Sequence, residues 1–342
     1  MKKIFTSVMA VLGLMTLHAQ SVFVDSKTGN DNNDGSENSP VFSIEKAAEI
    51  IRSADNDVYT MKICPGMYVL GHYVSVSTNK DITGKRILIE STLLPGDTNW
   101  APEKMPVIIC TAPKGEIDFD YHFVAGFLIE ASHVTFRGLK FPGYFYPNTR
   151  YFPICRLDKS KTDLFVEQCL FVGDEDASHL QVGIIAQGDS IRADHCIFYN
   201  VRNSVVFWMD AGSGMKTGNG ITNSIIYGAT QSGVWTAWPD DDFIFKNNIV
   251  ANCKNAWIKN AGNPTIYTID NCYFVNNENY LVEASNTGFN TDGFKINENN
   301  VLKEGEIYLV PKDAVLHFPL PIDYLHIVKD SLGYDMGAGL FK

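Results

Sequence analysis

The sequence predicts an all-β protein folded as a single-stranded, right-handed parallel β-helix, and three observations support this fold class. A short pattern of polar and apolar residues returns at nearly constant spacing between Leu164 and Leu302. No stretch with helical periodicity interrupts its copies. Of the 342 residues 45% are hydrophobic, and no Pro/Gly/Ser-rich linker divides the chain. Repeats of this length are typical of stacked β-coils, and we therefore expect one elongated domain, residues 20–342.

The repeat can be aligned on a four-residue unit whose last two residues are apolar. Its copies are Gln168-Cys169-Leu170-Phe171, His195-Cys196-Ile197-Phe198, Asn223-Ser224-Ile225-Ile226, Asn247-Asn248-Ile249-Val250, Asn271-Cys272-Tyr273-Phe274 and Asn299-Asn300-Val301-Leu302. Their last residues follow one another in steps of 27, 28, 24, 24 and 28 residues. Gly138-Leu139-Lys140-Phe141 extends the series backwards by a step of 30. We expect each step to be one coil.

Residues 1–19 have the three parts of a secretory signal peptide. Lys2 and Lys3 precede an apolar run of 14 residues, 4–17, and Leu17-His18-Ala19 stands before Gln20. The run is too short to cross a bilayer of ~30 Å as a helix, so we expect no membrane span. No cysteine follows directly, which argues against a lipid anchor. We expect the mature protein to begin near Gln20 and to be secreted or periplasmic.

Residues 20–60 are expected to form the N-terminal end of the coil. A strand at 22–24 is followed by a loop rich in turn residues. From Ser43 to Arg52 the apolar residues recur at helical spacing, with Ser43 as the N-cap. A parallel coil leaves its first strand unpaired, and we expect this short helix to cap it.

The C-terminal end is expected to be less regular. Residues 306–310 predict a last strand, and prolines at 311, 319 and 321 follow it. We expect 303–342 to form an irregular cap, with residues 335–338 tucked back onto the coil.

Charge and cysteine content restrict the functions that the chain can have. The formal net charge of -11 argues against a nucleic-acid-binding surface, which relies on clustered Lys and Arg. Seven cysteines, an odd number, do not form a disulfide framework. Cys169, Cys196 and Cys272 share one position of the repeat, and we expect them to be buried and stacked rather than to bind a metal.

Several motifs outside the repeat point to a known group of proteins. They are Val24-Asp25 through Gly29-Asn30-Asp31 to Asp34-Gly35, the helix entry at 40–48, Cys64-Pro65-Gly66-Met67-Tyr68 and Tyr334-Asp335-Met336-Gly337-Ala338. With the Asn-bearing coils, the chain resembles the pectate-lyase-like superfamily of right-handed β-helix proteins, in particular its secreted Bacteroidetes-type members. The resemblance covers essentially the whole mature chain. It implies a polysaccharide or oligosaccharide partner, and we expect a monomer.

The first residue of each repeat unit predicts a ladder of polar side chains. Parallel strands lie ~4.8 Å apart, so equivalent side chains stack and can form hydrogen bonds with one another. The ladder would consist of Gln168, His195, Asn223, Asn247, Asn271 and Asn299. Asp194-His195 could also be a catalytic dyad, but its register with the asparagines favours a structural role.

The strands that follow the ladder turns predict a sugar-binding groove. Counting eight residues from each unit places Val206, Val234, Ile258 and Val282 in an inward row. Their outward neighbours are then Phe207, Trp235, Lys259 and Glu283, with Trp238 and Asp210 just beyond. Aromatic rings stack on sugar faces and charged groups bind the polar edges. Alternatively, Trp208 and Trp257 are core residues. A shift of one residue would also exchange the inward and outward faces.

Two acidic clusters could bind Ca²⁺, the cofactor that the resemblance implies. In pectate lyases, calcium-binding aspartates precede a strand that leads into an Asp-His turn, and Asp174 and Asp176 occupy a similar place here. Asp210 and Asp240 are possible further ligands. The alternative is a solvated acidic loop.

A uronate lyase needs a cation to neutralise the carboxylate and a base to remove the C5 proton. Lys259 is the candidate base, provided that its pKa is lowered by ~2–3 units. Arg150 and Arg156 resemble an Arg-x-Pro-x-x-Arg motif of one pectate lyase family with one extra residue, and Arg156 is the candidate carboxylate clamp.

The chain is therefore expected to be a calcium-assisted uronate polysaccharide lyase, and two alternatives stay open. One is a non-catalytic glycan-binding or surface structural β-helix. The other is an inverting glycoside hydrolase, for which Asp240-Asp241 would need carboxylates ~6.5–9.5 Å apart. The Gly-His-Gly and Arg-Ile-Lys stretches of the superfamily's hydrolases are absent from the sequence.

Overall fold

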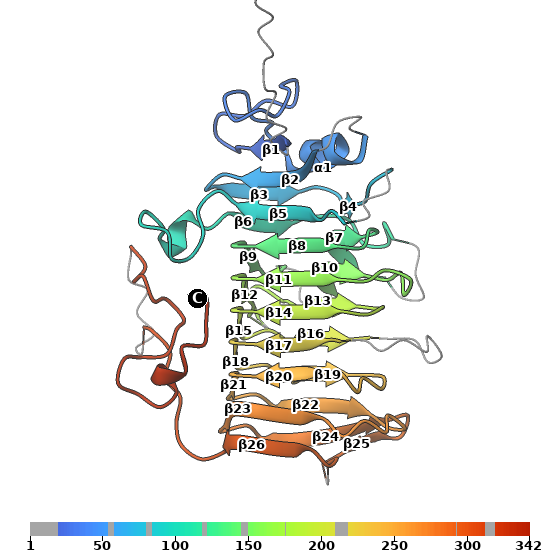
Figure 1. The fold of residues 1–342 in the computed structure, drawn as a ribbon, viewed down its shortest axis with the longest axis vertical. Helices are drawn as coiled ribbons and strands as arrows, with labels where there is room; N and C mark the ends of the chain where they lie inside the picture. The colour runs from blue at the N-terminus through green and yellow to red at the C-terminus, as the bar shows by residue number, and fades with distance from the viewer. Residues whose placement is uncertain are drawn as a thin grey trace, which may run out of the picture.

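The computed structural model describes residues 20–53, 58–79, 84–117, 122–144, 150–174, 176–208, 218–291, 293–311 and 319–342. These residues coil as a right-handed parallel β-helix from β1 at one end to β26 at the other (Figure 1). The predicted fold class is confirmed. The expected signal peptide lies outside the described residues.

Three faces make up the coil, and each complete turn of the chain adds one strand to every face. Face 1 comprises β1 (Gln20–Val24), β2 (Val58–Ile63), β5 (Ile87–Ser91), β8 (Val134–Arg137), β11 (Leu164–Glu167), β14 (Ile191–Asp194), β17 (Gly220–Thr222) and β20 (Ile244–Lys246). Face 2 comprises β3 (Met67–Leu70), β6 (Val107–Cys110), β9 (Lys140–Pro142), β12 (Leu170–Val172), β15 (Ile197–Tyr199), β18 (Ile225–Tyr227) and β21 (Ile249–Ala251). The long strands β23 (Thr268–Val275) and β26 (Asn297–Leu302) continue both faces.

Face 3 carries the strands that matter most for function. It comprises β4 (Val74–Val76), β7 (Val124–Ile129), β10 (Tyr151–Arg156), β13 (Val182–Ala186), β16 (Asn203–Phe207), β19 (Ser232–Thr236), β22 (Asn255–Asn260) and β24 (Asn279–Ser285). A short antiparallel strand, β25 (Gly288–Asn290), pairs with β24. Two 3₁₀ turns, Pro102–Lys104 and Tyr334–Met336, lie outside the faces.

The core fills the inside of the coil, where equivalent side chains from successive turns stack. The rings of Phe141, Phe171 and Phe198 are nearly parallel, with centroids 5.0 and 4.7 Å apart. Cys169, Cys196 and Cys272 are buried free thiols, as expected from their shared position. Each buried apolar side chain contributes roughly 1.5–3 kcal/mol relative to an exposed one, so these columns stabilise the coil.

The predicted capping helix is confirmed as α1 (Ile44–Ser53). The Ser43 hydroxyl accepts a hydrogen bond from the backbone N–H of Lys46 at 3.1 Å, which satisfies one of the unpaired donors of the first helical turn. Ile44, Ala47, Ala48 and Ile51 are buried.

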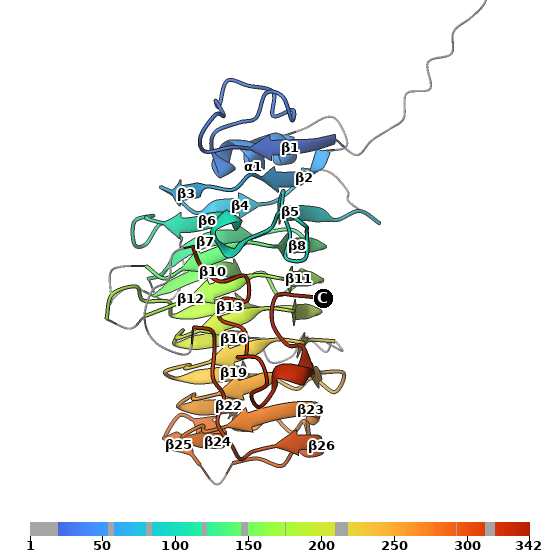
Figure 2. The same ribbon diagram turned by 90° about the vertical axis from the view of Figure 1, so that its left-hand side faces the viewer.

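The C-terminal segment runs back along the coil and covers face 2 (Figure 2). Apolar residues such as Leu325 and Leu340 pack against outward residues of face 2 such as Ile197 and Ile225. The predicted strand at 306–310 is wrong, because Leu309 makes only an isolated bridge to Ile327. The tucked-back position of residues 335–338 is confirmed, since Ala338 is buried in this contact. The segment covers the side of the coil rather than its end.

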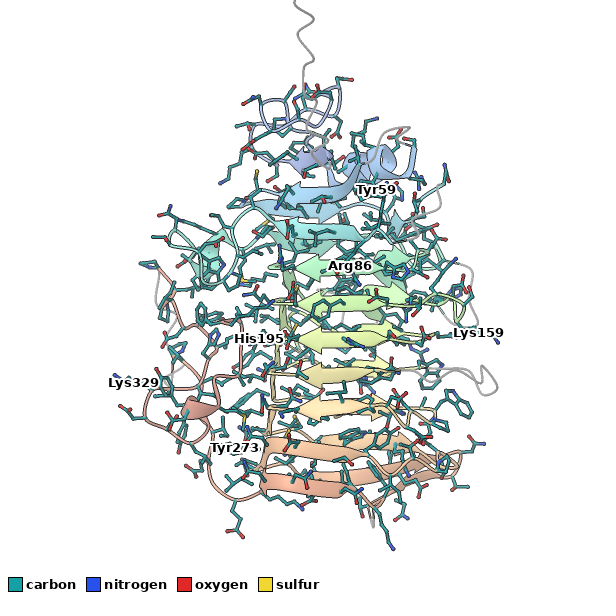
Figure 3. All side chains as sticks on the ribbon, viewed as in Figure 1. Tyr59, Arg86, Lys159, His195, Tyr273 and Lys329 are labelled. Carbon is teal, nitrogen blue, oxygen red and sulfur yellow. The ribbon has the colours of Figure 1, made fainter. Side chains whose placement is uncertain are left out.

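The ladder lies at the turn between faces 1 and 2, with His195 and Tyr273 near this edge (Figure 3). Its members all have positive φ values near 50°, which Asn tolerates better than most residues. Asn247 donates to Asn223 at 3.0 Å and Asn271 donates to Asn247 at 2.8 Å. The last member is Asn300 rather than the predicted Asn299, since Asn300 donates to Asn271 at 2.5 Å.

Candidate functional site

The register of face 3 decides which side chains reach its surface. The predicted outward row is right for Trp235 and wrong for Phe207, Lys259 and Glu283. Val206 pairs with Trp235, Trp235 with Ile258, and Ile258 with Val282. The neighbouring column contains Phe207, Thr236, Lys259 and Glu283. Phe207 belongs to the core inside the coil, so this second column points inward and the first points outward.

Two causes explain the error. Val206, Ile258 and Val282 were expected inside because they are apolar, although they point outward and are buried there. In addition, one turn differs in length from the others. The turn before β16 contains residues 200–202 and the turn before β22 contains residues 252–254, whereas the turn before β19 contains the four residues 228–231. A constant count of eight therefore puts Val234 with Val206, although Trp235 is its true neighbour. One residue reverses the facing of a strand.

The outward surface of face 3 has a cleft of about 360 Å³. It crosses β10, β13, β16 and β19, and it lies within the size range of ligand sites. Its lining residues are Arg150, Phe152, Gln181, Val182, Ile185, Arg202, Asn203, Val206, Trp208, Gln231 and Trp235.

Two tryptophans form the aromatic part of this cleft. The rings of Trp208 and Trp235 meet edge to face, with centroids 6.2 Å apart. Trp208 is 40% exposed. The indole N–H of Trp235 donates to the Asn260 side-chain oxygen at 2.7 Å, and Phe289 packs on the ring at 6.3 Å. Trp235 is therefore held in a fixed orientation while it lines the cleft.

The polar part of the cleft is cationic. Arg150 and Arg202 both line it, and none of its described lining residues is acidic. Arg202 Nε donates to the Gln231 side-chain oxygen at 3.0 Å, and the same oxygen accepts from Asn203 at 3.2 Å. These bonds fix one side of the guanidinium. In a protein with a formal net charge of -11, such a cleft favours an anionic ligand.

Arg156, the predicted carboxylate clamp, lies inside the coil and cannot reach a saccharide on the surface. Its side chain is fully buried, and its guanidinium donates to the backbone oxygens of Gln187 and Asp189 at 2.7 and 2.8 Å. Burial lowers the pKa of Arg156 to about 10, although Asp189 opposes this shift. The residue stabilises the turn between faces 3 and 1.

Lys259, the predicted base, also lies in the inward column. Its side chain is 7% exposed, and its ammonium donates to the Asn263 backbone oxygen at 2.8 Å and lies 4.8 Å from the centre of the Phe294 ring. Burial lowers the pKa of Lys259, and Glu283 partly opposes this. Lys259 and Glu283 are not in the cleft, and their catalytic and binding roles stay predictions from the sequence.

The other predicted aromatic residues are divided among different places. Trp208 and Trp235 line the cleft, whereas Phe207 and Trp257 belong to the core. Trp238 is half-buried in the turn after β19 and does not line the cleft.

The predicted calcium ligands that the structure describes lie in two different turns of the coil. The Asp174 carboxylate accepts the backbone N–H groups of Asp176 and Ala177 at 2.9 Å, in the turn between faces 2 and 3. Asp240 is 4% exposed, in the turn between faces 3 and 1. Asp210 lies outside the described residues. No cluster of three or more His, Cys, Asp or Glu suited to a metal ion occurs in the described part of the chain. Calcium binding stays a prediction from the sequence.

Sequence reasoning missed the polar residues at the cleft rim. Gln181, Arg202 and Gln231 each directly precede a strand of face 3, and Lys254 and Glu278 continue this series on the next two strands. Alignment on the strand starts, rather than on the ladder, could have found this column.

Comparisons with known proteins give no family. No family model matches the chain, and neither does any curated protein. Among solved structures, the chain is similar to a GH136 lacto-N-biosidase from Eubacterium ramulus, at 10% identity and a TM-score of 0.44 over 83% of this chain and 55% of that one. The chain thus spans little more than half of that protein.

The chain is similar to two further solved structures at similarly low identity. One is a rhamnogalacturonan lyase, with 14% identity and a TM-score of 0.33 over 84% of this chain and 62% of that one. The other is XylC in complex with xylose, with 10% identity and a TM-score of 0.47 over 85% and 70%. No helix among the described residues is long and apolar enough to span a membrane.

Proposed function

We propose that this is a secreted carbohydrate-binding β-helix protein whose face 3 cleft binds an acidic, uronate-containing saccharide. The observation that carries the proposal is the combination of Trp208 and Trp235 with Arg150 and Arg202 in one cleft. Indole faces stack on the apolar faces of sugar rings, and guanidinium groups pair with carboxylates in two parallel hydrogen bonds.

The composition of the cleft favours binding over hydrolysis. An inverting hydrolase needs one carboxylic acid and one carboxylate on opposite sides of the bond. None of the described lining residues is acidic, and Asp240 is buried with its carboxylate accepting the backbone N–H groups of Asn219 and Asp242 at 3.1 Å. The described part of the cleft therefore presents arginines and no carboxylic acids.

Uronate β-elimination is the second candidate, since the two arginines could neutralise the uronate carboxylate. In this reaction a base removes the C5 proton, the electron pair forms the C4–C5 double bond and the glycosidic oxygen leaves from C4. The described lining residues include no Lys, His or Tyr that would serve as this base. We therefore propose that the cleft binds the saccharide without cleaving it.

Titration with uronate oligosaccharides and with neutral glucan oligosaccharides, followed by calorimetry, tests this function. We expect binding of the uronate series only. Arg202→Gln and Trp235→Ala should each weaken it about tenfold or more, because each removes roughly 1.5 kcal/mol of charged or stacking interaction.

Two matched variants serve as controls. Arg52→Gln removes an arginine from α1, and Trp238→Ala removes a tryptophan outside the cleft, so both should bind as the unchanged protein does. Equal affinity for neutral oligosaccharides, or full binding by Arg202→Gln, would contradict the proposal. The ultraviolet absorbance of an unsaturated product, measured on the same samples, distinguishes a lyase from a binding protein.

A further inference from the structure

A second hollow lies on face 1, on another side of the coil from the cleft. It has a volume of about 240 Å³ and shares no residue with the face 3 cleft. Its lining residues are Phe165, Arg192, Ala193, Asp194, Asn219, Gly220, Thr222 and Ile244. Face 2 is covered by the C-terminal segment, whereas this part of face 1 is open: Ile244 is 47% exposed.

The hollow arises from the outward column of face 1. Phe165 pairs with Arg192, Arg192 with Gly220, and Gly220 with Ile244. Gly220 has no side chain, which leaves a gap between Arg192 and Ile244. A larger residue would not fit, since a Cβ at position 220 would lie 2.4 Å from the Ile244 backbone oxygen. Adjacent strands are ~4.8 Å apart, so this gap of two strand spacings is about 10 Å long.

The two charged side chains at the hollow differ in how many hydrogen bonds they already make. Asp194 accepts hydrogen bonds from Thr222 at 2.6 Å, Asn223 at 2.8 Å and His195 at 2.9 Å. Both of its oxygens are thereby engaged. Arg192 is exposed, and its Nε donates to the Gly218 backbone oxygen at 3.3 Å. Arg192 is thus the group at this hollow that can take up an anion.

We infer that this hollow on face 1 binds a single uronic acid unit. The volume is below the usual ~300–1,000 Å³ of ligand sites, which suits one ring rather than an extended chain. Phe165 and Ile244 provide apolar contacts for the ring, Arg192 binds the carboxylate, and the Thr222 oxygen can still accept from a sugar hydroxyl. The inference does not depend on the face 3 proposal.

The test uses a protein in which the face 3 cleft carries Arg202→Gln and Trp235→Ala, so that binding there is strongly weakened and the second site dominates the measurement. Saturation-transfer NMR with glucuronate as the probe should give a binding signal in this background, and glucose should give none. Arg192→Gln and Ile244→Glu should each reduce glucuronate affinity at least tenfold. Both residues are exposed, so circular dichroism should show an unchanged fold.

Three results would overturn the inference. They are the absence of a glucuronate signal in the double variant, an unchanged affinity in both Arg192→Gln and Ile244→Glu, and benzoate binding more tightly than glucuronate. The last would identify a general site for small ring carboxylates. Loss of oligosaccharide binding in calorimetry concerns the face 3 cleft alone, so the two proposals fail separately.

Discussion

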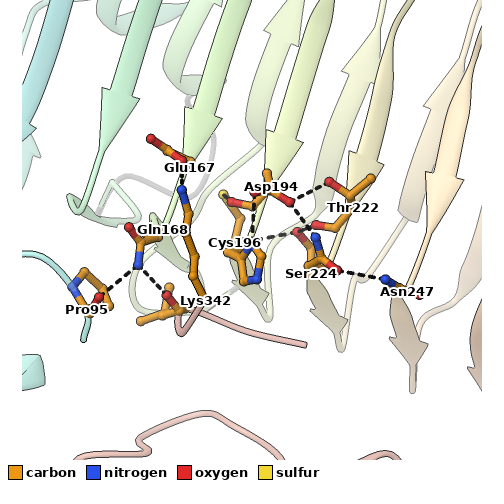
Figure 4. A network of polar contacts seen from close by, with 12 residues as sticks. Pro95, Glu167, Gln168, Asp194, Cys196, Thr222, Ser224, Asn247 and Lys342 are labelled. Carbon is orange, nitrogen blue, oxygen red and sulfur yellow. Dashed lines mark hydrogen bonds and ion pairs between the residues drawn. The ribbon is translucent and has the colours of Figure 1, made fainter. Parts of the chain in front are cut away.

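At the scale of single residues, hydrogen-bond partners determine the role of the Asp194–His195 pair. Burial alone would raise the pKa of Asp194, but hydrogen bonds from His195, Thr222 and Asn223 outweigh it and lower the pKa to about 2. His195 has the backbone conformation of the ladder, with a φ of 49°. Figure 4 shows the Asp194 contacts beside Gln168 and Ser224 of neighbouring coils. The pair stabilises the turn and is remote from the face 3 cleft.

Replacement of Asp194 should therefore affect stability in a pH-dependent way. A carboxyl whose folded-state pKa is depressed contributes stability above its unfolded pKa and loses it as pH falls through the folded pKa. Asp194→Asn should lower the free energy of unfolding by about 2 kcal/mol at pH 7, and the difference should narrow below about pH 4. Urea denaturation across this pH range measures it. A constant difference would show that the carboxylate charge is not involved.

At the scale of elements, the sequence predicted what repeats and missed what varies. The periodicity of the sequence was sufficient to predict the coil, the helix α1 and five of the six ladder positions. The facing of β16, β22 and β24 was missed because Val206, Ile258 and Val282 point outward although they are apolar and buried. Trp235 on β19 points outward as predicted, because the turn before β19 has one residue more. The path of the C-terminal segment was missed for another reason: its partner surface, the outside of face 2, exists only after the coil has formed.

The C-terminal segment is attached to face 2 partly through His326. Its Nε2 accepts the backbone N–H of Leu340 at 2.8 Å, its Nδ1 donates to the Tyr324 backbone oxygen at 3.1 Å, and its ring stacks on Phe341. Nε2 must be unprotonated to accept this bond. Burial lowers the pKa of His326, although the Tyr324 and Asp323 carbonyls and the Asp323 charge oppose it.

Acidification should loosen this segment. A histidine whose folded pKa is depressed contributes stability above its unfolded pKa, which is near 6.5, and that stability is lost as pH falls below it. Hydrogen exchange at the Leu340 amide, corrected for its intrinsic pH dependence, should be faster at pH 5 than at pH 7. His326→Gln, which does not titrate, should remove the difference. Equal protection at both pH values in the unchanged protein would refute the prediction.

At the scale of the whole molecule, a column of alternating charges runs along face 1 next to the ladder. Lys62 pairs with Glu90, Glu90 with Arg137, and Arg137 lies 3.5 Å from Glu167. The alternation breaks where Glu167 and Asp194 are neighbours in register. The last residue of the chain, Lys342, forms an ion pair with Glu167 at this place. Lys342 thereby compensates the charge of Glu167 next to Asp194 (Figure 4).

Removing the ion pair between Lys342 and Glu167 should destabilise the protein slightly. Lys342→Met should lower the free energy of unfolding by about 1 kcal/mol at low ionic strength, since Glu167 is largely buried whereas Lys342 is half exposed. The effect should shrink at 1 M salt because screening is then strong. Lys342→Arg should behave as the unchanged protein. Thermal unfolding at two salt concentrations measures it, and a loss independent of salt would exclude the electrostatic explanation.

Whether the face 3 cleft binds an acidic saccharide can be seen in a crystal structure of the protein with a uronate tetrasaccharide. We predict sugar density along β13, β16 and β19, with a ring against Trp208 or Trp235 and a carboxylate within hydrogen-bond distance of Arg202 or Arg150. An empty face 3 cleft, or a saccharide bound only elsewhere on the coil, would contradict the claim.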